Sequence, residues 1–144
     1  MQHGFAWNGT TYTTLDVPGA SWTWAYGINN KGLMTVEWGD SAGNYEASYY
    51  DGKKYKTIDV PKAVNSYVHG IDSAGDVVYA WSDSTGLLHG ALCTKCTSSG
   101  RKYYKFHDPK GPKNTAADGI NDHKLISGNY IDNNDVGFGF KATY

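Results

Sequence analysis

The stretch YTTLDVPGASWTWAYGINNKG, residues 12–32, decides the fold because it returns later in the chain. The string YKTIDVPKAVNSYVHGIDSAG, residues 55–75, matches it at nine of 21 positions. A weaker third copy, YKFHDPKGPKNTAADGINDHK, covers residues 104–124. The copies are offset by 43 and then by 49 residues, and the six extra residues lie within CTKCTSSGRK. Such a period is typical of proteins built from one repeated structural unit.

The composition favours strands over helices. The 144 residues include 18 Gly, 12 Tyr and 5 Trp. Aromatic and β-branched residues suit pleated sheets, and Gly supplies the positive φ of tight turns. Because no window sustains the spacing of an amphipathic helix, we expect one all-β domain over residues 1–144.

Charge and hydropathy exclude two classes of partner. A net charge of -1 gives no general attraction to nucleic acid or to an anionic membrane. No apolar run approaches the ~18 residues that a spanning helix needs, and MQHGFAW has no signal-peptide pattern. We therefore expect neither nucleic-acid binding nor membrane insertion.

Each unit contains four short strand candidates separated by turn signals. In the first unit these are GFAW, TYTTLDV, TWAYGI and LMTVEW. The units are residues 3–45, 46–88 and 89–137, followed by a closing strand at 138–144. Four strands per ~43 residues is the arithmetic of a β-propeller blade, and also that of a β-trefoil. Since three blades do not close a ring, the propeller hypothesis requires a half ring completed by a second copy, as a homodimer.

The pattern resembles the HAF repeats of bacterial extracellular proteins. The resemblance rests on GINNKGLMTVEWGDSAG, on the YKTIDVP that follows, and on the start His3-Gly4-Phe5, and it covers nearly the whole chain. It implies propeller blades and an extracellular or periplasmic location. It carries no activity that could be transferred to this chain.

Small residues line one face of the third strand in each unit. Gly27, Gly70 and Gly119 occupy equivalent positions on that face, which permits close approach of another backbone and suits an inner strand of a ring. Asp59 and Asp108, like other Asp residues near proline, are predicted to form turns.

Positions at which the copies differ are the candidates for function. Tyr26, His69 and Asp118 are equivalent positions on the inner strand, so a ring would gather them at its channel mouth. These residue types could bind a polar ligand or, in an enzyme, act as catalytic acid and base. The alternative is that each is bonded locally within its own unit. Glu37 and Asn129 form a second variable set, one strand further on.

Trp22 is a further candidate for ligand binding. We expect it on the face opposite to Trp24 and directed outward, because its counterparts Asn65 and Asn114 are polar. An exposed indole ring could stack on a sugar, and it would equally suit a protein interface.

Cys93 and Cys96 form a C-x-x-C within the insertion. In an extracellular protein a local disulfide is the favoured interpretation, and free thiols are the alternative in the cytosol. Zinc would need further ligands, and only His89 and His107 lie nearby in sequence. Loops that begin with Asp are explained by turn chemistry without calcium. We therefore predict no metal and no cofactor.

These observations favour a binding module over an enzyme. The expected ligand is a glycan or another extracellular molecule. A polysaccharide-active hydrolase or lyase that uses Tyr26, His69 and Asp118 is one alternative. A self-assembling propeller fragment without a small ligand is another.

Overall fold

The computed structural model describes residues 1–58, 60–107 and 113–144, and these residues form strands and no helix. The strands are β1 (Gly4–Trp7), β2 (Tyr12–Leu15), β3 (Trp22–Ile28), β4 (Met34–Gly39), β5 (Tyr45–Tyr50), β6 (Tyr55–Thr57), β7 (Asn65–Ile71), β8 (Val77–Ser82), β9 (Leu88–Thr94), β10 (Lys102–Phe106), β11 (Asn114–Ile120), β12 (Leu125–Ile131) and β13 (Gly137–Thr143). The prediction of an all-β chain is confirmed. The predicted turn residues Asp59 and Asp108 lie outside the described part of the chain.

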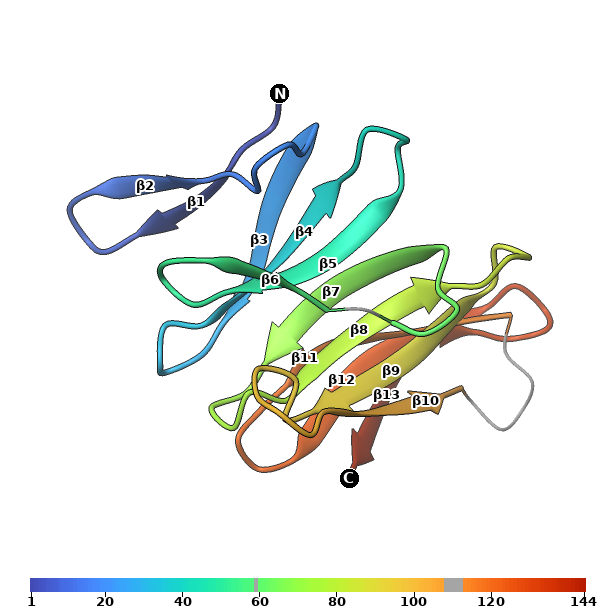
Figure 1. The fold of residues 1–144 in the computed structure, drawn as a ribbon. Coiled ribbons are helices and arrows are strands. Elements are labelled where there is room, and N and C mark those ends of the chain that lie inside the picture. The colour runs from blue at the N-terminus through green and yellow to red at the C-terminus, as the bar shows by residue number, and fades with distance from the viewer. Residues whose placement is uncertain (59, 108–112) are drawn as a thin grey trace.

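Antiparallel pairing divides the strands among four sheets, which follow one another along the chain (Figure 1). The N-terminal hairpin is β1–β2, the first full sheet is β3–β4–β5–β6, and the second full sheet is β7–β8–β9–β10. The C-terminal sheet holds only β11, β12 and β13. Within the described ranges these sheets close neither a barrel nor a ring.

The sheets are offset from the sequence units 3–45, 46–88 and 89–137 by two strands. Each full sheet takes the last two strands of one unit and the first two of the next. The turn after β4 is a tight hairpin in which Gly43 N–H donates to the carbonyl of Asp40, so β5 returns beside β4. The connection after β2 leaves its sheet at Val17 and Pro18, because proline has no N–H with which to continue a ladder.

Apolar side chains pack between consecutive sheets. The first interface, between the two full sheets, buries Ala47, Tyr49, Ile58, Val60, Val68, Ile71, Val77, Tyr79, Trp81, Ala91, Cys93 and Cys96. Among the described residues, the second interface, between the second full sheet and the C-terminal sheet, buries Val78, Leu92, Ala117 and Ile126. Since complete burial of a large aliphatic side chain stabilises by about 1.5–3 kcal/mol, the first interface supplies most of the packing energy.

The first strands of successive sheets approach one another closely. A Cβ on Gly27 of β3 would lie 2.7 Å from the carbonyl oxygen of His69 on β7. A Cβ on Gly70 of β7 would lie 3.0 Å from the amide nitrogen of Ile120 on β11. The expected close approach is thus confirmed at these two glycines, whereas Gly119 is crowded only by Ser127 of its own sheet.

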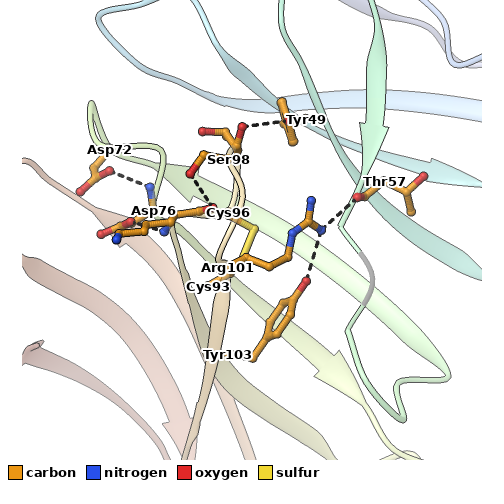
Figure 2. Close-up of a disulfide and its surroundings, with 11 residues drawn as sticks. Tyr49, Thr57, Asp72, Asp76, Cys93, Cys96, Ser98, Arg101 and Tyr103 are labelled. Atoms are coloured by element: carbon orange, nitrogen blue, oxygen red, sulfur yellow. Dashed lines mark hydrogen bonds between the residues drawn. A yellow bond between two sulfur atoms is a disulfide. The ribbon is translucent and has the colours of Figure 1, made fainter.

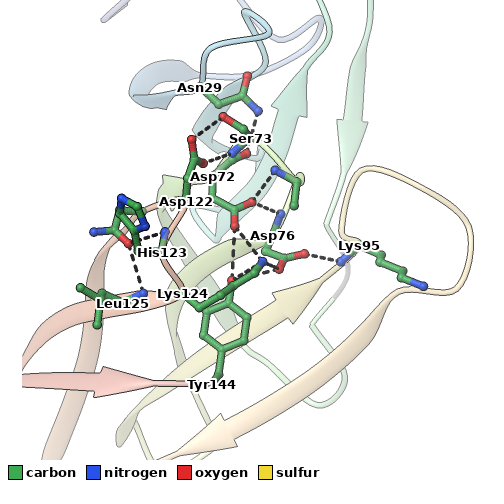
Figure 3. A network of polar contacts seen from close by, with 12 residues as sticks. Asn29, Asp72, Ser73, Asp76, Lys95, Asp122, His123, Lys124, Leu125 and Tyr144 are labelled. Atoms are coloured by element: carbon green, nitrogen blue, oxygen red, sulfur yellow. Dashed lines mark hydrogen bonds and ion pairs between the residues drawn. The ribbon is translucent and has the colours of Figure 1, made fainter.

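Turns of successive sheets also bond to one another (Figure 3). Asn29 Nδ2 donates to the carbonyl of Asp72 at 2.8 Å, a separation of 43 residues. The amide of Ser73 donates to Asp122 Oδ1 at 2.7 Å, a separation of 49 residues. These separations equal the two offsets between the sequence copies, so equivalent turns contact one another.

Candidate functional site

Three sheets bring Tyr26, His69 and Asp118 together. These residues lie on β3, β7 and β11, the first strand of each sheet. The rings of Tyr26 and His69 meet edge to face with centroids 5.6 Å apart, and His69 Nδ1 lies 3.4 Å from Asp118 Oδ1. The structure therefore groups the three candidate residues, which we call the first-strand site.

Hydrogen bonds orient two of these side chains. His69 Nδ1 donates to the carbonyl of Ala117 at 2.9 Å. Because a carbonyl oxygen only accepts, Nδ1 carries the hydrogen in this contact and Nε2 is the nitrogen that can accept one. Asn129 Nδ2 donates to Asp118 Oδ2 at 2.8 Å, so Asn129, from the second variable set, supports the site from β12.

A cavity of about 270 Å³ opens at this place, lined by Tyr26, Gly27, His69, Gly70 and Asp118. The two glycines contribute backbone and no side chain, so they leave the room that the three functional side chains surround. The Tyr26 residue is 49% exposed and the Asp118 side chain 47%, so both are accessible to a ligand. An aromatic ring, a carboxylate and an imidazole together suit a small polar ligand.

Glu37 lies behind the first-strand site and does not line the cavity. It is 2% exposed on β4, and no described residue forms a hydrogen bond with its Oε2. Burial raises the pKa of this carboxyl group from 4.5 to about 7. Burial of its own phenol, and to a smaller extent the charge of Glu37, raise the pKa of Tyr26. Glu37 therefore influences the site electrostatically without contact with solvent.

The expectation that Trp22 lies on the face opposite to Trp24 is wrong. The two indole rings lie on the same side of β3, with centroids 4.4 Å apart, because residues two apart on a strand share a face. Trp22 is only partly exposed, and it also contacts the ring of Tyr45 at 4.9 Å. It lies four residues along β3 from Tyr26, roughly 13 Å by the rise of a strand, so it is not part of the first-strand site.

The polar counterparts of Trp22 have a structural role. Asn65 Oδ1 accepts the backbone N–H of Tyr45, and Asn114 Oδ1 accepts that of Leu88, each at 2.9 Å. Each bond joins the first strand of one sheet to the third strand of the preceding sheet. The polarity of these positions therefore reflects bonding between sheets rather than exposure to solvent.

Cys93 and Cys96 are joined as a disulfide inside the insertion (Figure 2). Both are fully buried in the first interface. The insertion also contacts the first full sheet, since Tyr49 Oη donates to the carbonyl of Thr97 at 3.2 Å and Arg101 Nη1 donates to that of Thr57 at 3.5 Å. The extra residues thus cover the outer part of the first interface.

Among the described residues no group of three or more His, Cys, Asp or Glu side chains is placed to hold an ion. His89 Nε2 instead contacts Asp83 Oδ2 at 2.8 Å, and its ring stacks on Trp81. The loop carboxylates of Asp40 and Asp132 accept N–H groups of their own turns.

A second, larger cavity was not foreseen from the sequence. It is an apolar groove of about 600 Å³ beside the second interface, and its walls include Leu92, Tyr104, Phe106, Ile126, Phe140 and Ala142. No local pattern could predict it, because it depends on the number of strands in the C-terminal sheet.

A buried acidic pair joins the second full sheet to the C-terminal sheet (Figure 3). Lys124 Nζ lies 2.8 Å from Asp76 and 3.2 Å from Asp72, and Tyr144 Oη donates to Asp76 at 2.9 Å. Although burial disfavours the charged form of Asp76, bonds from Lys124, the Lys95 amide and Tyr144 lower its pKa. Lys124 adopts φ 62° at the position where the first two copies have glycine. The replacement of glycine by lysine is the sequence feature that could have indicated this ion pair.

Comparison with known proteins adds no name to this geometry. No protein-family model matches the chain, and no curated protein is similar enough in sequence to count as a match. The described part of the chain contains no helix that is long and apolar enough to cross a membrane.

Proposed function

We propose that the chain is part of a β-propeller of HAF-type repeats and acts as a non-enzymatic binding module, outside the cytoplasm, for a glycan or another extracellular ligand. Each full sheet is one blade, and a second copy completes the ring. The contacts between equivalent turns and between equivalent glycines support this arrangement, because blades around a common axis bring equivalent positions of neighbouring blades together.

The observation that carries the binding function is the first-strand site. Three residues at equivalent positions, 43 and 49 residues apart, surround one cavity. The exposed ring of Tyr26 can pack on the apolar face of a sugar ring. The carboxylate of Asp118 can accept hydrogen bonds from sugar hydroxyl groups, and His69 Nε2 is an additional hydrogen-bond acceptor. A few convergent polar groups beside an aromatic ring are sufficient to fix the orientation of a small ligand.

A glycan array followed by titration calorimetry tests this function. We expect His69→Ala and Asp118→Ala each to weaken binding at least tenfold, because each removes a polar contact that the ligand cannot replace. His123→Ala is the matched control, since His123 is an exposed histidine on a turn outside the cavity. Binding that survives His69→Ala and Asp118→Ala would contradict the assignment of this site.

A polysaccharide-active hydrolase or lyase is the second candidate. The approach of His69 to Asp118, with Nε2 left as the acceptor, favours it, because a base with this geometry can abstract a proton. The buried Glu37 cannot serve as a second catalytic carboxyl group that touches a polymer. Turnover of a polysaccharide that His69→Ala abolishes would establish the enzyme, whereas binding without turnover supports the module.

The third candidate is a scaffold that assembles without a small ligand. It would give full-sized assemblies in light scattering, with no bound glycan on the array and no turnover. Light scattering, the glycan array and the turnover assay together therefore separate the three functions.

A further inference from the structure

Among the described residues, the C-terminal sheet has three strands, and no strand takes the place that β6 and β10 occupy in the full sheets. In the second full sheet, β10 pairs with β9 and places Tyr103 against the core of the first interface. In the C-terminal sheet, β13 pairs with β12 along one edge, and no described strand pairs with its other edge. The apolar groove of about 600 Å³ lies beside this edge, with Phe140 and Ala142 of β13 in its wall.

Strand β2 is the equivalent of the missing strand. Its register on β1, Ala6 opposite Thr13, repeats that of the full sheets, where Tyr49 is opposite Lys56 and Leu92 is opposite Tyr104. This register makes Tyr12, Tyr55 and Tyr103 equivalent. The sequence alignment instead pairs the first two with Tyr104, one residue later in the third copy. Tyr12 is therefore the residue that corresponds to the core-packing Tyr103.

The N-terminal hairpin exposes large aromatic side chains. Phe5 is 62% exposed, Trp7 59% and Tyr12 69%, and the Tyr12 ring contacts both of the others. A contiguous exposed apolar patch of this kind indicates a surface that another element covers. The molecule thus has an uncovered aromatic strand at one end and an uncovered apolar groove at the other.

We propose that β2 of a second copy adds to the free edge of β13 and places its Tyr12 in the groove. This rests on the ring of the proposed function and specifies how it closes. By equivalence with β9 and β10, Lys141 would lie opposite Thr13 of the second copy, and Ala142 opposite its Tyr12. Phe140 and Ala142 pack toward the groove, so a Tyr12 opposite Ala142 points into it. Exchange in both directions joins two copies around a two-fold axis.

The ladder lengths favour β13 over β1 as the neighbour of the added strand. Within the proposed ring, β13 of one copy and β1 of the other are equivalent to β5 and β9, so both compete to be the third strand of the same sheet. β13 is paired with β12 over seven residues, Leu125–Ile131, whereas β1 is paired with β2 over four. When β2 leaves β1 and pairs with β13, four residue pairs of the β-ladder are lost and four are formed. The burial of Tyr12 in the groove is then the net stabilising contribution. Release of β1 uncovers little, because Phe5 and Trp7 are already exposed.

A reversible lock tests the exchange in the full chain. Ala6→Cys with Thr13→Cys places two cysteines directly opposite each other on β1 and β2, within reach of a disulfide. We expect the oxidised variant to show the mass of one chain in light scattering, and the reduced variant the mass of two. A locked variant that still forms the dimer would overturn the proposal, because β1 would then move together with β2.

A second cysteine pair detects the new contact itself. Thr13→Cys with Lys141→Cys should form a covalent dimer in which peptide mapping finds residue 13 joined to residue 141. Ser127→Cys with Ala6→Cys is the matched control, since it links copies only if β1 of the second copy replaces β13. A cross-link in the control and none between residues 13 and 141 would overturn the proposal.

Single substitutions complete the test without new thiols. Tyr12→Ala should raise the dimer dissociation constant at least tenfold, whereas Trp7→Ala should leave it unchanged, because only Tyr12 enters the groove. Equal effects of the two changes would contradict the proposed exchange. The first-strand cavity is built by one chain, so ligand binding by the locked variant tests the proposed function separately.

Discussion

The second full sheet packs against one neighbouring sheet on each face, and these two interfaces differ in how completely they are filled. In the first interface, the residues of β5, β7, β8 and β9 and the disulfide-bonded insertion form a closed core. In the second, Leu92, Phe106, Ile126 and Phe140 form the walls of an open groove. The strands on either side are equivalent, so the difference comes from β10 and its insertion, which have no counterpart among the described strands of the C-terminal sheet.

This comparison shows that one sheet of the repeat cannot bury its own apolar face. The face is covered only when the next sheet carries four strands, and a three-strand sheet leaves apolar side chains beside open space.

The same isoleucine-to-alanine substitution should lower the free energy of unfolding more in the first interface than in the second. Ile58 and Ile126 are 2% and 3% exposed. We expect Ile58→Ala to lower the free energy of unfolding by about 4 kcal/mol and Ile126→Ala by about 2 kcal/mol, because the groove already provides space at Ile126. Urea denaturation at a concentration where the chain is a single copy measures both. Equal costs would show that the two interfaces do not differ in packing.

Close approach of the first strands is tested at Gly27. The added Cβ of Gly27→Ala would lie 2.7 Å from a carbonyl oxygen and 3.3 Å from Gly70 Cα, and this overpacking should cost about 2 to 3 kcal/mol. Gly137→Ala is the control, because nothing lies within 4 Å of the added atom. Thermal denaturation of the two variants measures the difference. A Gly27→Ala variant as stable as the control would mean that β3 and β7 are further apart than described.

Glu37 gives the first interface a pH dependence. Its folded-state pKa of about 7 exceeds the usual 4.5, so the folded chain holds an extra proton between these values. Its contribution to stability is therefore complete below about pH 4.5 and is lost as pH rises through 7. We expect Glu37→Gln to be more stable than the parent chain by about 2 kcal/mol at pH 8 and little changed at pH 5. A difference that is independent of pH would contradict a buried, protonated Glu37.

The disulfide makes a smaller contribution to the first interface. The bond closes a loop with a sequence separation of three, so the constraint that it places on the unfolded chain is modest. We expect Cys93→Ala with Cys96→Ala to lower stability by about 1 to 2 kcal/mol. Mass spectrometry with and without reductant verifies the bond in the parent chain, and denaturant melts measure the change. Two free thiols in the oxidised parent chain would contradict the pairing.

Much of the fold could be predicted because the repeat and the turn residues are local signals. The strand candidates GFAW and TWAYGI appear as β1 and in β3, and the grouping of Tyr26, His69 and Asp118 follows from their equivalence. Equivalent positions on neighbouring strands meet in space whenever the units pack in the same way. The grouping of these three side chains could therefore be predicted without knowledge of the detailed geometry.

Other features depend on which strands pair, and the sequence does not specify this. The sequence units begin at the first strand of the chain, whereas the full sheets begin at the third, because the connection after β2 crosses between sheets. The face of Trp22 is mispredicted because residues two apart on a strand share a face, so Trp22 lies on the side of Trp24. The apolar groove follows from the strand count of one sheet and has no local signal.

The molar mass in solution is the most direct test of the claim that a second copy covers the open interface. Light scattering over a range of concentrations should give twice the 15.8 kDa of the chain, with dissociation caused by Tyr12→Ala. A mass of 15.8 kDa at all concentrations would contradict it, because the groove and the aromatic strand would then remain uncovered.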